Sequence, residues 1–369
     1  MTRMRRSRDR WGLALGVAVI LAAAATGAWA SSPPILSTGP HGEKPSAVSS
    51  VVLTSAELAK VKGMHATAAI VLHYAGNDWS TAQVTGLKFE FAKLGIKVIA
   101  VTDANFKPDK QVSDIETVLV KKPSIIVSIP TDPVATASAY KRASKAGVKL
   151  VFMDNVPNGM KPGKDYVSVV SADNYGNGVA SAKLMCQALH GKGTIGAVYH
   201  GADFFVTHQR WVGFKTTLAK SCPGVKIVVS TGISGPDFAG QADTAAGAML
   251  TRYPSLSGIW GVWDVPAEGI MSAARAAGRS NLVITTEDLG LNVAVEMARK
   301  GLVDGLGAQR PFDQGVTEAK LAAYGLIGKK APIYVALPAL PVTHANVLQA
   351  WQQVYHAAPP GTLKKAYKK

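Results

Sequence analysis

The alternation of short apolar runs with amphipathic segments limits the possible folds of this chain more than any other feature of its sequence. The apolar run Ala68–Leu72 is followed by a segment in which Val84, Leu87 and Phe91 recur at helical spacing. The same succession repeats to about residue 308. Because helices that join parallel strands cross over in a right-handed sense, this alternation predicts parallel sheets covered by helices.

The periodicity also predicts approximate bounds for the elements. Strands are predicted at 68–72, 96–101, 125–128, 149–152, 194–199, 225–231, 258–261, 282–286 and 303–308. Helices are predicted at 109–120, 174–189, 207–220, 237–252, 265–277 and 289–300. Asp132-Pro133 is expected to open one more helix, since Asp is a good N-cap and Pro fits the first helical position.

The two halves of this pattern resemble each other. In the first half, Ile126–Pro133 and a helix ending in Ala-Gly precede Leu150–Asp154. In the second half, Ile259–Pro266 and another helix ending in Ala-Gly precede Leu282–Asp288. The sequence therefore predicts an α/β protein of two doubly wound, Rossmann-like lobes with parallel sheets and a cleft between them.

Residues 1–30 have the features of a secretory signal peptide. Five arginines precede an uncharged apolar run from Trp11 to Ala25, and Ala28 and Ala30 are the small residues that signal peptidase reads. An uncleaved membrane anchor is the alternative, although the alanine-rich end of the run is weakly hydrophobic for a span. No cysteine adjoins the cleavage site, so we expect export to the periplasm of a two-membrane bacterium without a lipid anchor.

The formal net charge of +16 raises the question of a nucleic-acid partner. Residues 1–30 hold five arginines and one aspartate, so the rest of the chain carries about +12. Its lysines are scattered over predicted helix faces and a short basic tail, and no basic stretch is interleaved with aromatic residues. We therefore expect a solvated basic surface and no nucleic-acid partner.

The chain has two cysteines, Cys186 and Cys222. In an oxidising compartment such a pair can form a disulfide, and one residue on a helix and one just past the next helix are compatible with a bridge. Two buried free thiols are the alternative, and the sequence leaves both open.

Polar and aromatic side chains follow the predicted strands, at the edge where ligands bind in open parallel sheets. They include His73, Asn77, Trp79, Asp154, Phe238, Trp263, Asp288 and Gln309. Carboxylates and amides hydrogen-bond hydroxyl groups, and aromatic faces cover the C–H faces of a sugar. This mixture therefore predicts a site for a polyhydroxylated ligand.

Several of the aspartates have a simpler structural interpretation. Asp78, Asp132, Asp237 and Asp264 stand where helix N-caps are expected. Asp154 and Asp288 differ from these four, because each ends a predicted buried strand without beginning a convincing helix.

Motifs for catalysis are missing from the sequence. It contains no Gly-x-Ser-x-Gly motif, no Walker loop and no His/Cys cluster with metal-ligand spacing. Gly176-Asn177-Gly178 is only a fragment of the dinucleotide-binding motif and lacks the strand that should precede it. We therefore expect a binding protein with no cofactor and no metal, and not an enzyme.

From about Thr67 to Val342 the sequence resembles the ribose/galactose-type periplasmic sugar-binding proteins, which have the type I periplasmic binding fold. The segments that carry the resemblance are 99–103, 126–132, 151–154, 167–174, Arg210-Trp-Val-Gly-Phe214, 258–264, Asp288 and 307–311. The resemblance implies two lobes joined by three crossings, near 171–173, 309–311 and 336–338. It implies residues 66–171 plus 310–336 as the N-terminal lobe and 172–309 plus 337–358 as the C-terminal lobe. Residues 31–65 are rich in Pro, Ser and Gly and are predicted to be a linker or strap, and the lysines of 359–369 predict a basic tail.

The resemblance also implies a set of ligand-binding positions. In this chain they fall on His73, Asn77, Trp79, Ser80, Asp154, Asn155, His208, Phe238, Trp263, Asp288 and Gln309.

The chain departs from the ribose-binding members at four of these positions. Asn155 and His208 stand where those members place arginines, Trp263 where they have an asparagine, and Ser80 where they have a stacking aromatic. Loss of the arginines argues against an anionic ligand and leaves two carboxylates uncompensated. A neutral polyol or deoxysugar is the first expectation, and a small cation between Trp79 and Trp263 is the alternative.

These features predict the monomeric, periplasmic receptor of an ABC importer. It would bind a sugar, deoxysugar or polyol between its lobes, and ligand would shift the population from open to closed lobes. The closed surface would then dock on a membrane permease. The alternative is a sensory receptor that presents its ligand to a chemotaxis or signalling partner.

Overall fold

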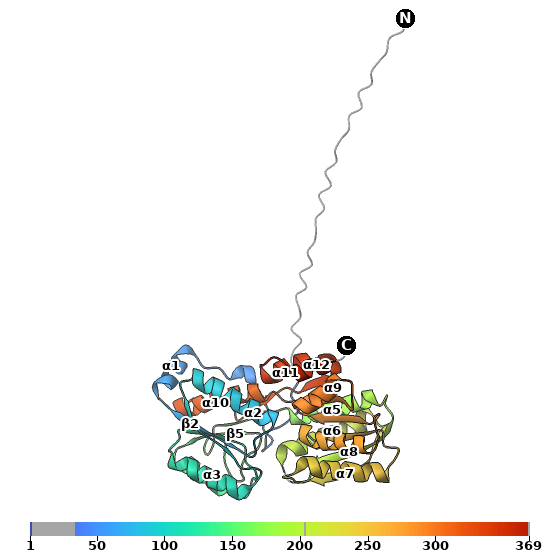
Figure 1. Cartoon of the computed structure of the whole chain (residues 1–369). Helices are drawn as coiled ribbons and strands as arrows, with labels where there is room; N and C mark the ends of the chain where they lie inside the picture. Colours follow the sequence, from blue (N-terminus) through green and yellow to red (C-terminus); the bar gives the residue numbers. More distant parts are fainter. Residues whose placement is uncertain (2–33, 203, 368–369) are drawn as a thin grey trace. The chain divides into compact units, whose positions relative to one another are not determined.

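The computed structural model describes residue 1, residues 34–202 and residues 204–367. Apart from Met1, the predicted signal peptide lies outside the described residues. Residues 34–367 contain two parallel sheets, each covered by helices, as Figure 1 shows. The predicted α/β class with two doubly wound lobes is confirmed.

The sheet of the first lobe has seven parallel strands in the order β1-β12-β6-β5-β4-β2-β3. These are β1 (Ser46–Ala47), β2 (Thr67–Leu72), β3 (Lys97–Asp103), β4 (Ile125–Ser128), β5 (Lys149–Met153), β6 (Ser168–Ala172) and β12 (Tyr334–Leu337). The order reverses between β2 and β4, and ligands bind beside such a reversal.

Alternate residues of these strands enter two hydrophobic layers. Ala68, Ile70 and Leu72 of β2 pack in one layer, on the side of α2 (Asp78–Lys93) and α10 (Pro311–Ile327). Ala69 and Val71 pack in the other layer, with α3 (Pro108–Val120) and α4 (Ala137–Lys145). Since successive side chains of a strand point to opposite faces, a strand covered on both faces is apolar throughout. This is why the strand appears in the sequence as an unbroken apolar run.

The sheet of the second lobe has the order β13-β11-β10-β9-β7-β8. Its strands are β7 (Gly193–His200), β8 (Val225–Ile233), β9 (Gly258–Gly261), β10 (Val283–Glu287), β11 (Val303–Ala308) and β13 (Leu340–Thr343). Only β13 is antiparallel to its neighbour, β11. Its helices are α5 (Asn174–Ala188), α6 (Phe205–Ser221), α7 (Phe238–Arg252), α8 (Asp264–Ala276) and α9 (Leu291–Ala298).

The chain passes between the two sheets three times. It leaves the first sheet after Ala172 and enters α5 at Asn174, returns between Ala308 and Pro311, and crosses again between β12 and β13. The three crossings predicted from the resemblance are therefore confirmed. These three crossing segments form the hinge between the lobes.

The segment predicted to be a linker or strap contributes to the first lobe and also reaches the second. It forms β1, which pairs with β12, a 3₁₀ turn (Val48–Ser50) and α1 (Ser55–Gly63), whose Val61 is fully buried. Before β1, Leu36 N and Ser37 N donate to the carboxylate of Asp173 at 2.9 and 2.8 Å, beside the first crossing. The Oγ of Ser37 donates to the same carboxylate at 2.8 Å. Residues 34–47 therefore connect the first crossing of the hinge, at Asp173, with the sheet of the first lobe.

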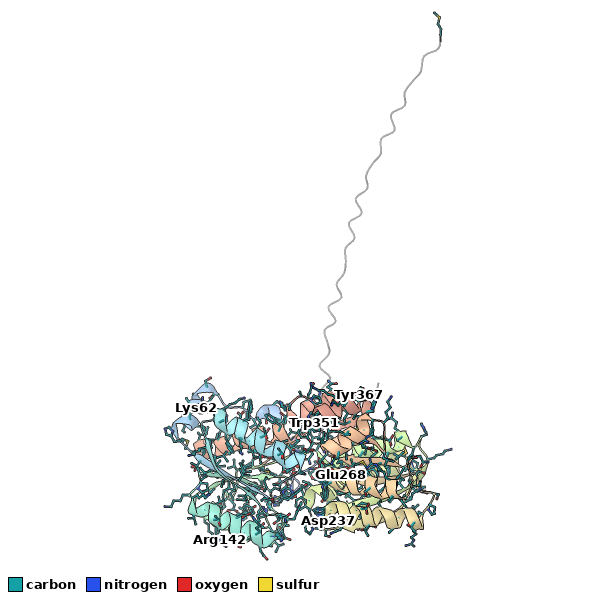
Figure 2. All side chains as sticks on the ribbon, in the orientation of Figure 1. Lys62, Arg142, Asp237, Glu268, Trp351 and Tyr367 are labelled. Carbon is teal, nitrogen blue, oxygen red and sulfur yellow. A yellow bond between two sulfur atoms is a disulfide. The ribbon has the colours of Figure 1, made fainter. Side chains whose placement is uncertain are left out.

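The C-terminal residues pack on the second lobe. After β13 come a 3₁₀ turn (His344–Asn346), α11 (Val347–Tyr355) and α12 (Gly361–Ala366). Trp351 of α11 and Leu363 of α12 belong to the hydrophobic core of that lobe, and Figure 2 shows Trp351 and Tyr367 along one edge of it. The segment predicted to be a basic tail, residues 359–369, is described up to residue 367 and contains α12. This helix packs on the second lobe, because its Leu363 is buried in the hydrophobic core.

Two local predictions have clear outcomes. A disulfide joins Cys186 of α5 to Cys222, the residue after α6, with Cα atoms 6.1 Å apart. Asp132 does not open a helix: its Oδ1 accepts from Val134 N and Ala135 N in a separate turn, and α4 begins only at Ala137.

Of the other three predicted caps, only Asp237 is at an N-cap, where its Oδ1 accepts from Gly240 N at 2.9 Å. Asn77 and Trp263 occupy the N-cap positions of α2 and α8, so Asp78 and Asp264 each begin the first turn instead. Within the described part of the chain, no helix is both long and apolar enough to cross a bilayer.

Candidate functional site

A cavity of about 50 Å³ lies between the strand ends of the two lobes. Seven of the eleven predicted ligand positions line it: His73, Asn77, Trp79, Asp154, Trp263, Asp288 and Gln309. Eight further residues complete the lining: Tyr74, Phe106, Ile129, His200, Phe204, Val206, Thr207 and Arg210. The cavity therefore takes polar and aromatic side chains from both lobes.

The other four predicted positions lie beside or away from the cavity. Ser80 is buried in the first turn of α2, where its Oγ donates to Asn77 O at 3.1 Å. Asn155 is buried, with no hydrogen-bond partner for its side chain among the described residues. Phe238 is buried against Trp263, and His208 is exposed on α6. A role for these four in ligand binding stays a prediction.

Asp154 and Asp288 occupy equivalent places in the two lobes. Each follows a central strand, β5 or β10, and each has a positive φ, of 58° and 63°. Aspartate adopts this left-handed conformation more readily than most residues, because its short polar side chain can hydrogen-bond locally. The turn ends each strand and leaves the carboxylate at the cavity.

A chain of buried hydrogen bonds begins at Asp154 and crosses the hinge. Ser171 Oγ donates to Asp154 Oδ1 at 2.6 Å, and Asn174 Nδ2 donates to Ser171 Oγ at 3.0 Å. Arg210 Nε then donates to Asn174 Oδ1 at 2.9 Å. Since Ser171 belongs to β6 of the first lobe and Asn174 begins α5 of the second, the chain connects the two lobes at their first crossing.

Arg210 extends this network to the other carboxylate. Its Nη1 donates to Asp288 Oδ2 at 2.9 Å and to Val262 O at 3.2 Å, and its Nε lies 3.3 Å from Glu287 Oε2. Gln309 Nε2 donates to the second oxygen of Asp288, also at 2.9 Å. Both oxygens of Asp288 therefore have partners before any ligand is considered.

The expectation that the site lacks an arginine and leaves both carboxylates uncompensated is wrong. His208 stands at the position where the ribose-binding members have an arginine, and its side chain is exposed to solvent. Arg210, two residues further along α6, lines the cavity. Arg210 was part of a segment that carried the family resemblance, but the sequence did not show which residue of this helical turn faces inward. Two residues along a helix rotate a side chain by about 200°.

Close packing of α5 against α6 places Arg210. A Cβ on Gly178 of α5 would lie 2.2 Å from Arg210 O, and a Cβ on Gly213 of α6 would lie 2.3 Å from Tyr175 O. Only glycine at both positions allows the two helix backbones to approach so closely. The approach brings the guanidinium of Arg210 within reach of Asn174 at the start of α5.

Burial governs the electrostatics of the cavity. It raises the pKa of Asp154 to about 6, against the stabilising hydrogen bond from Ser171 and the charge of Arg210. Burial also raises the pKa of Glu287 well above its ordinary value, although Arg210 opposes this shift. For the two histidines the effect is reversed: burial lowers the pKa of His73 to about 3 and that of His200 to about 4. Both imidazoles are therefore neutral at neutral pH.

Aromatic rings from the two lobes meet across the cavity. His73 of the first lobe stacks on Phe204 of the second, with ring centroids 6.0 Å apart, and Phe106 contacts Phe238 edge-on at 5.0 Å. A further contact between lobes joins Leu291 N to Asp78 Oδ2 at 2.7 Å. Among residues 34–202 and 204–367, no cluster of His, Cys, Asp or Glu has the geometry of a metal site.

Two parallel-sheet lobes, three crossings and a polar cavity between the strand ends define a class of two-lobed ligand-binding proteins. The model of the periplasmic binding protein domain family matches residues 68–330, and this chain belongs to that family.

Similar proteins include the D-allose-binding periplasmic protein of Escherichia coli (strain K12), which is 26% identical over 259 residues, covering 69% of this chain and 82% of that protein. The D-ribose/D-allose-binding protein of Pseudomonas aeruginosa is 27% identical over 244 residues, covering 66% and 73%. Among solved structures, an ABC transporter solute-binding protein from Agrobacterium vitis with bound α-D-tagatopyranose has a TM-score of 0.71 at 23% identity, covering 78% of this chain and 99% of that one. This last likeness supports the fold.

Proposed function

We propose that this protein is the periplasmic receptor of an ABC importer and binds a neutral sugar, deoxysugar or polyol between its lobes. The observation that carries the proposal is the pair of carboxylates Asp154 and Asp288, one from each lobe, joined by one hydrogen-bonded network across the hinge. A ligand whose hydroxyls donate to both carboxylates would hold the lobes together, and so would favour the closed form.

The charges around the cavity favour a neutral ligand. Arg210 already neutralises Asp288 in part, and Glu287 lies on its other side. An anion would therefore have to displace a carboxylate from the guanidinium, and a cation would face the guanidinium itself. The names of the relatives from Escherichia coli and Pseudomonas aeruginosa, which are sugar-binding proteins, support the same class of ligand.

The remaining parts of the proposal concern the context of the protein. The signal peptide predicted at residues 1–30 would direct it to the periplasm, where a monomer would deliver its ligand to a membrane permease. The protein would bind its ligand without converting it, and this part of the proposal is supported by the names of the relatives, which are binding proteins.

Thermal-shift screening of the exported chain against sugars, deoxysugars and polyols tests this function. A ligand that binds the folded state stabilises it by RT ln(1 + [L]/Kd), so the melting temperature rises with the ligand concentration. Asp154→Asn and Asp288→Asn should each abolish the shift, because each removes a charged hydrogen-bond acceptor for the ligand. Asp109→Asn, on the exposed first turn of α3, is the matched control and should keep it. Equal shifts in all three variants would mean that the ligand binds elsewhere.

A further inference from the structure

His200 lines the cavity but is not among the eleven predicted ligand positions. It is the last residue of β7, so its imidazole reaches the cavity from the strand ends of the second lobe. The rings of Phe204, Phe238 and Trp263 contact it, each with its centroid 5.6 Å from that of the imidazole. These contacts fix the plane of the imidazole, and the hydrogen bond of Nδ1 then fixes which edge of the ring carries Nε2.

The hydrogen bonds of Thr207 determine which nitrogen of His200 carries the proton. Thr207 Oγ1 donates to Phe204 O at 3.0 Å, and it lies 3.1 Å from His200 Nδ1. Because a hydroxyl has a single proton, both bonds form only if Nδ1 is protonated and donates to Thr207 Oγ1. With the proton on Nε2 instead, Thr207 could make only one of the two bonds. The tautomer with the proton on Nδ1 therefore forms one hydrogen bond more.

This tautomer leaves a free lone pair on Nε2 of His200. Burial, with a smaller contribution from the charge of Arg210, lowers the pKa of His200 to about 4, so the ring is neutral at neutral pH. Nε2 has no hydrogen-bond partner among residues 34–202 and 204–367, yet it is not one of the fully buried unpartnered atoms there, so it stays accessible. This nitrogen is therefore an unused hydrogen-bond acceptor in the wall of the cavity.

An acceptor of this kind selects for a hydroxyl group on the ligand. Nε2 accepts a hydrogen bond from an O–H group, whereas an ether or carbonyl oxygen at the same place would bring a second lone pair against it. Both oxygens of Asp288 already accept hydrogen bonds, from Arg210 and Gln309, but Nε2 of His200 accepts none from the described residues. Being uncharged, His200 also accepts a hydroxyl without adding to the negative charge of the cavity.

We propose that His200 is a ligand-binding residue that determines specificity, and that its Nε2 accepts a hydrogen bond from a hydroxyl of the bound sugar or polyol. Thr207 is the positioning residue, because it holds the proton of the imidazole on Nδ1. The ligand therefore carries a free hydroxyl where it meets His200, and a derivative without this hydroxyl binds more weakly. This inference rests on the proposed function and narrows its range of ligands.

The tautomer of His200 can be measured without any ligand. In long-range proton–nitrogen correlation spectra of the exported, full-length chain with isotope-labelled histidine, the two neutral tautomers and the protonated ring give different patterns. The chain has eight histidines, and His200→Phe identifies the signals of His200 by their loss. We expect the proton on Nδ1 in the parent and in Thr207→Ser, and a shift toward Nε2 in Thr207→Val, which lacks the hydroxyl. A proton on Nε2 in the parent would overturn the inference.

Isothermal titration calorimetry with D-allose, D-ribose and the monodeoxy derivatives of each tests the contact with the ligand. His200→Phe keeps an aromatic ring in place but has no acceptor, so it should bind the complete sugar about five- to a hundredfold more weakly than the parent does. One monodeoxy derivative should bind the parent more weakly by a similar factor. His200→Phe should bind that derivative about as tightly as the complete sugar, because the hydrogen bond is already missing. His41→Phe, in an exposed turn outside the cavity, is the matched control and should bind like the parent.

The possible outcomes separate this inference from the proposed function. If the parent binds a sugar and His200→Phe binds it equally well, the inference is wrong and the receptor function stands. The inference is also wrong if every monodeoxy derivative loses the same factor in His200→Phe as in the parent, since His200 then contacts no hydroxyl. If neither these sugars nor any compound of the thermal-shift screen binds the parent, the proposed function fails, and the inference fails with it.

Discussion

Replacing Arg210 by methionine should destabilise the protein far more than replacing a surface arginine whose ion pair is shorter. The side chain of Arg210 is 4% exposed and lies between Glu287, at 3.3 Å, and Asp288, at 2.9 Å. The matched control is Arg142, whose Nη2 lies 2.6 Å from Glu116, with side chains 49% and 56% exposed. Figure 2 shows Arg142 at the outer edge of the first lobe.

The expected magnitudes follow from burial and not from distance. Removing one partner of a buried pair costs about 3–5 kcal/mol, because the other charge stays buried without compensation. An exposed pair contributes about 0–1 kcal/mol, because water solvates both charges when the pair is broken. Arg210→Met should therefore lower the free energy of unfolding by about 3–5 kcal/mol, and Arg142→Met by less than about 1 kcal/mol.

Urea denaturation at neutral pH, followed by tryptophan fluorescence and by circular dichroism, measures both changes. The double variant Arg210→Met/Asp288→Asn should recover about 1–2 kcal/mol, since asparagine removes the carboxylate charge that Arg210→Met leaves unpaired. Burial raises the pKa of Glu287 well above its ordinary value even with Arg210 in place, so a proton can neutralise that carboxyl when the arginine is removed. Comparable losses for Arg210→Met and Arg142→Met would refute the reasoning.

Three further predictions concern the hinge, the disulfide and the pH dependence. Ser37→Ala should lower the free energy of unfolding by about 1–3 kcal/mol in a urea titration, because it removes a buried hydrogen bond to the carboxylate of Asp173, and an unchanged midpoint would contradict this role for residues 34–47. The double variant Cys186→Ser/Cys222→Ser should lower the free energy of unfolding by about 2–4 kcal/mol, since the disulfide closes a loop with a sequence separation of 36. Reducing the disulfide of the parent protein should lower the free energy of unfolding by the same amount. The folded-state pKa of Asp154, about 6, lies above its ordinary value of 3.8, so the folded form binds the proton more tightly, and this carboxyl reduces stability as the pH rises between about 4 and 6. Asp154→Asn should therefore gain less stability than the parent when the pH is lowered from about 7 to about 5, and parallel stability curves for the two proteins would count against the raised pKa.

Most of the regular architecture could be predicted from local patterns. The structure has β4, β9 and β11 with the bounds that the sequence predicts. Every residue of β4 and β9 is buried, as expected for short apolar strands that are covered on both faces. The repeat between the halves predicted the equivalent places of Asp154 and Asp288. Helix starts were less predictable. Asp132 was predicted to open a helix, but its side chain accepts a hydrogen bond from Val134 N in a local turn, and α4 begins only at Ala137.

The site was only partly predictable. His73, Trp79, Asp154 and other strand-end residues line the cavity, as their positions after strands suggested. Phe106 and Phe204 were missed, because an aromatic residue in a loop has the same local signature in a cavity wall as in a hydrophobic core. Their neighbours in space lie far away in the sequence: Phe106 contacts Phe238, and Phe204 contacts His73.

The sequence by itself determined which segments become strands and helices, and that they form two similar lobes, because the period of apolar residues depends only on the geometry of each element. The tertiary structure alone decided that Arg210, and not His208, faces the cavity, and that residues 34–47 bind the hinge at Asp173. It also decided how small the cavity is. These properties depend on the rotation of one helix against another and on contacts between residues distant in the chain, which no local pattern encodes.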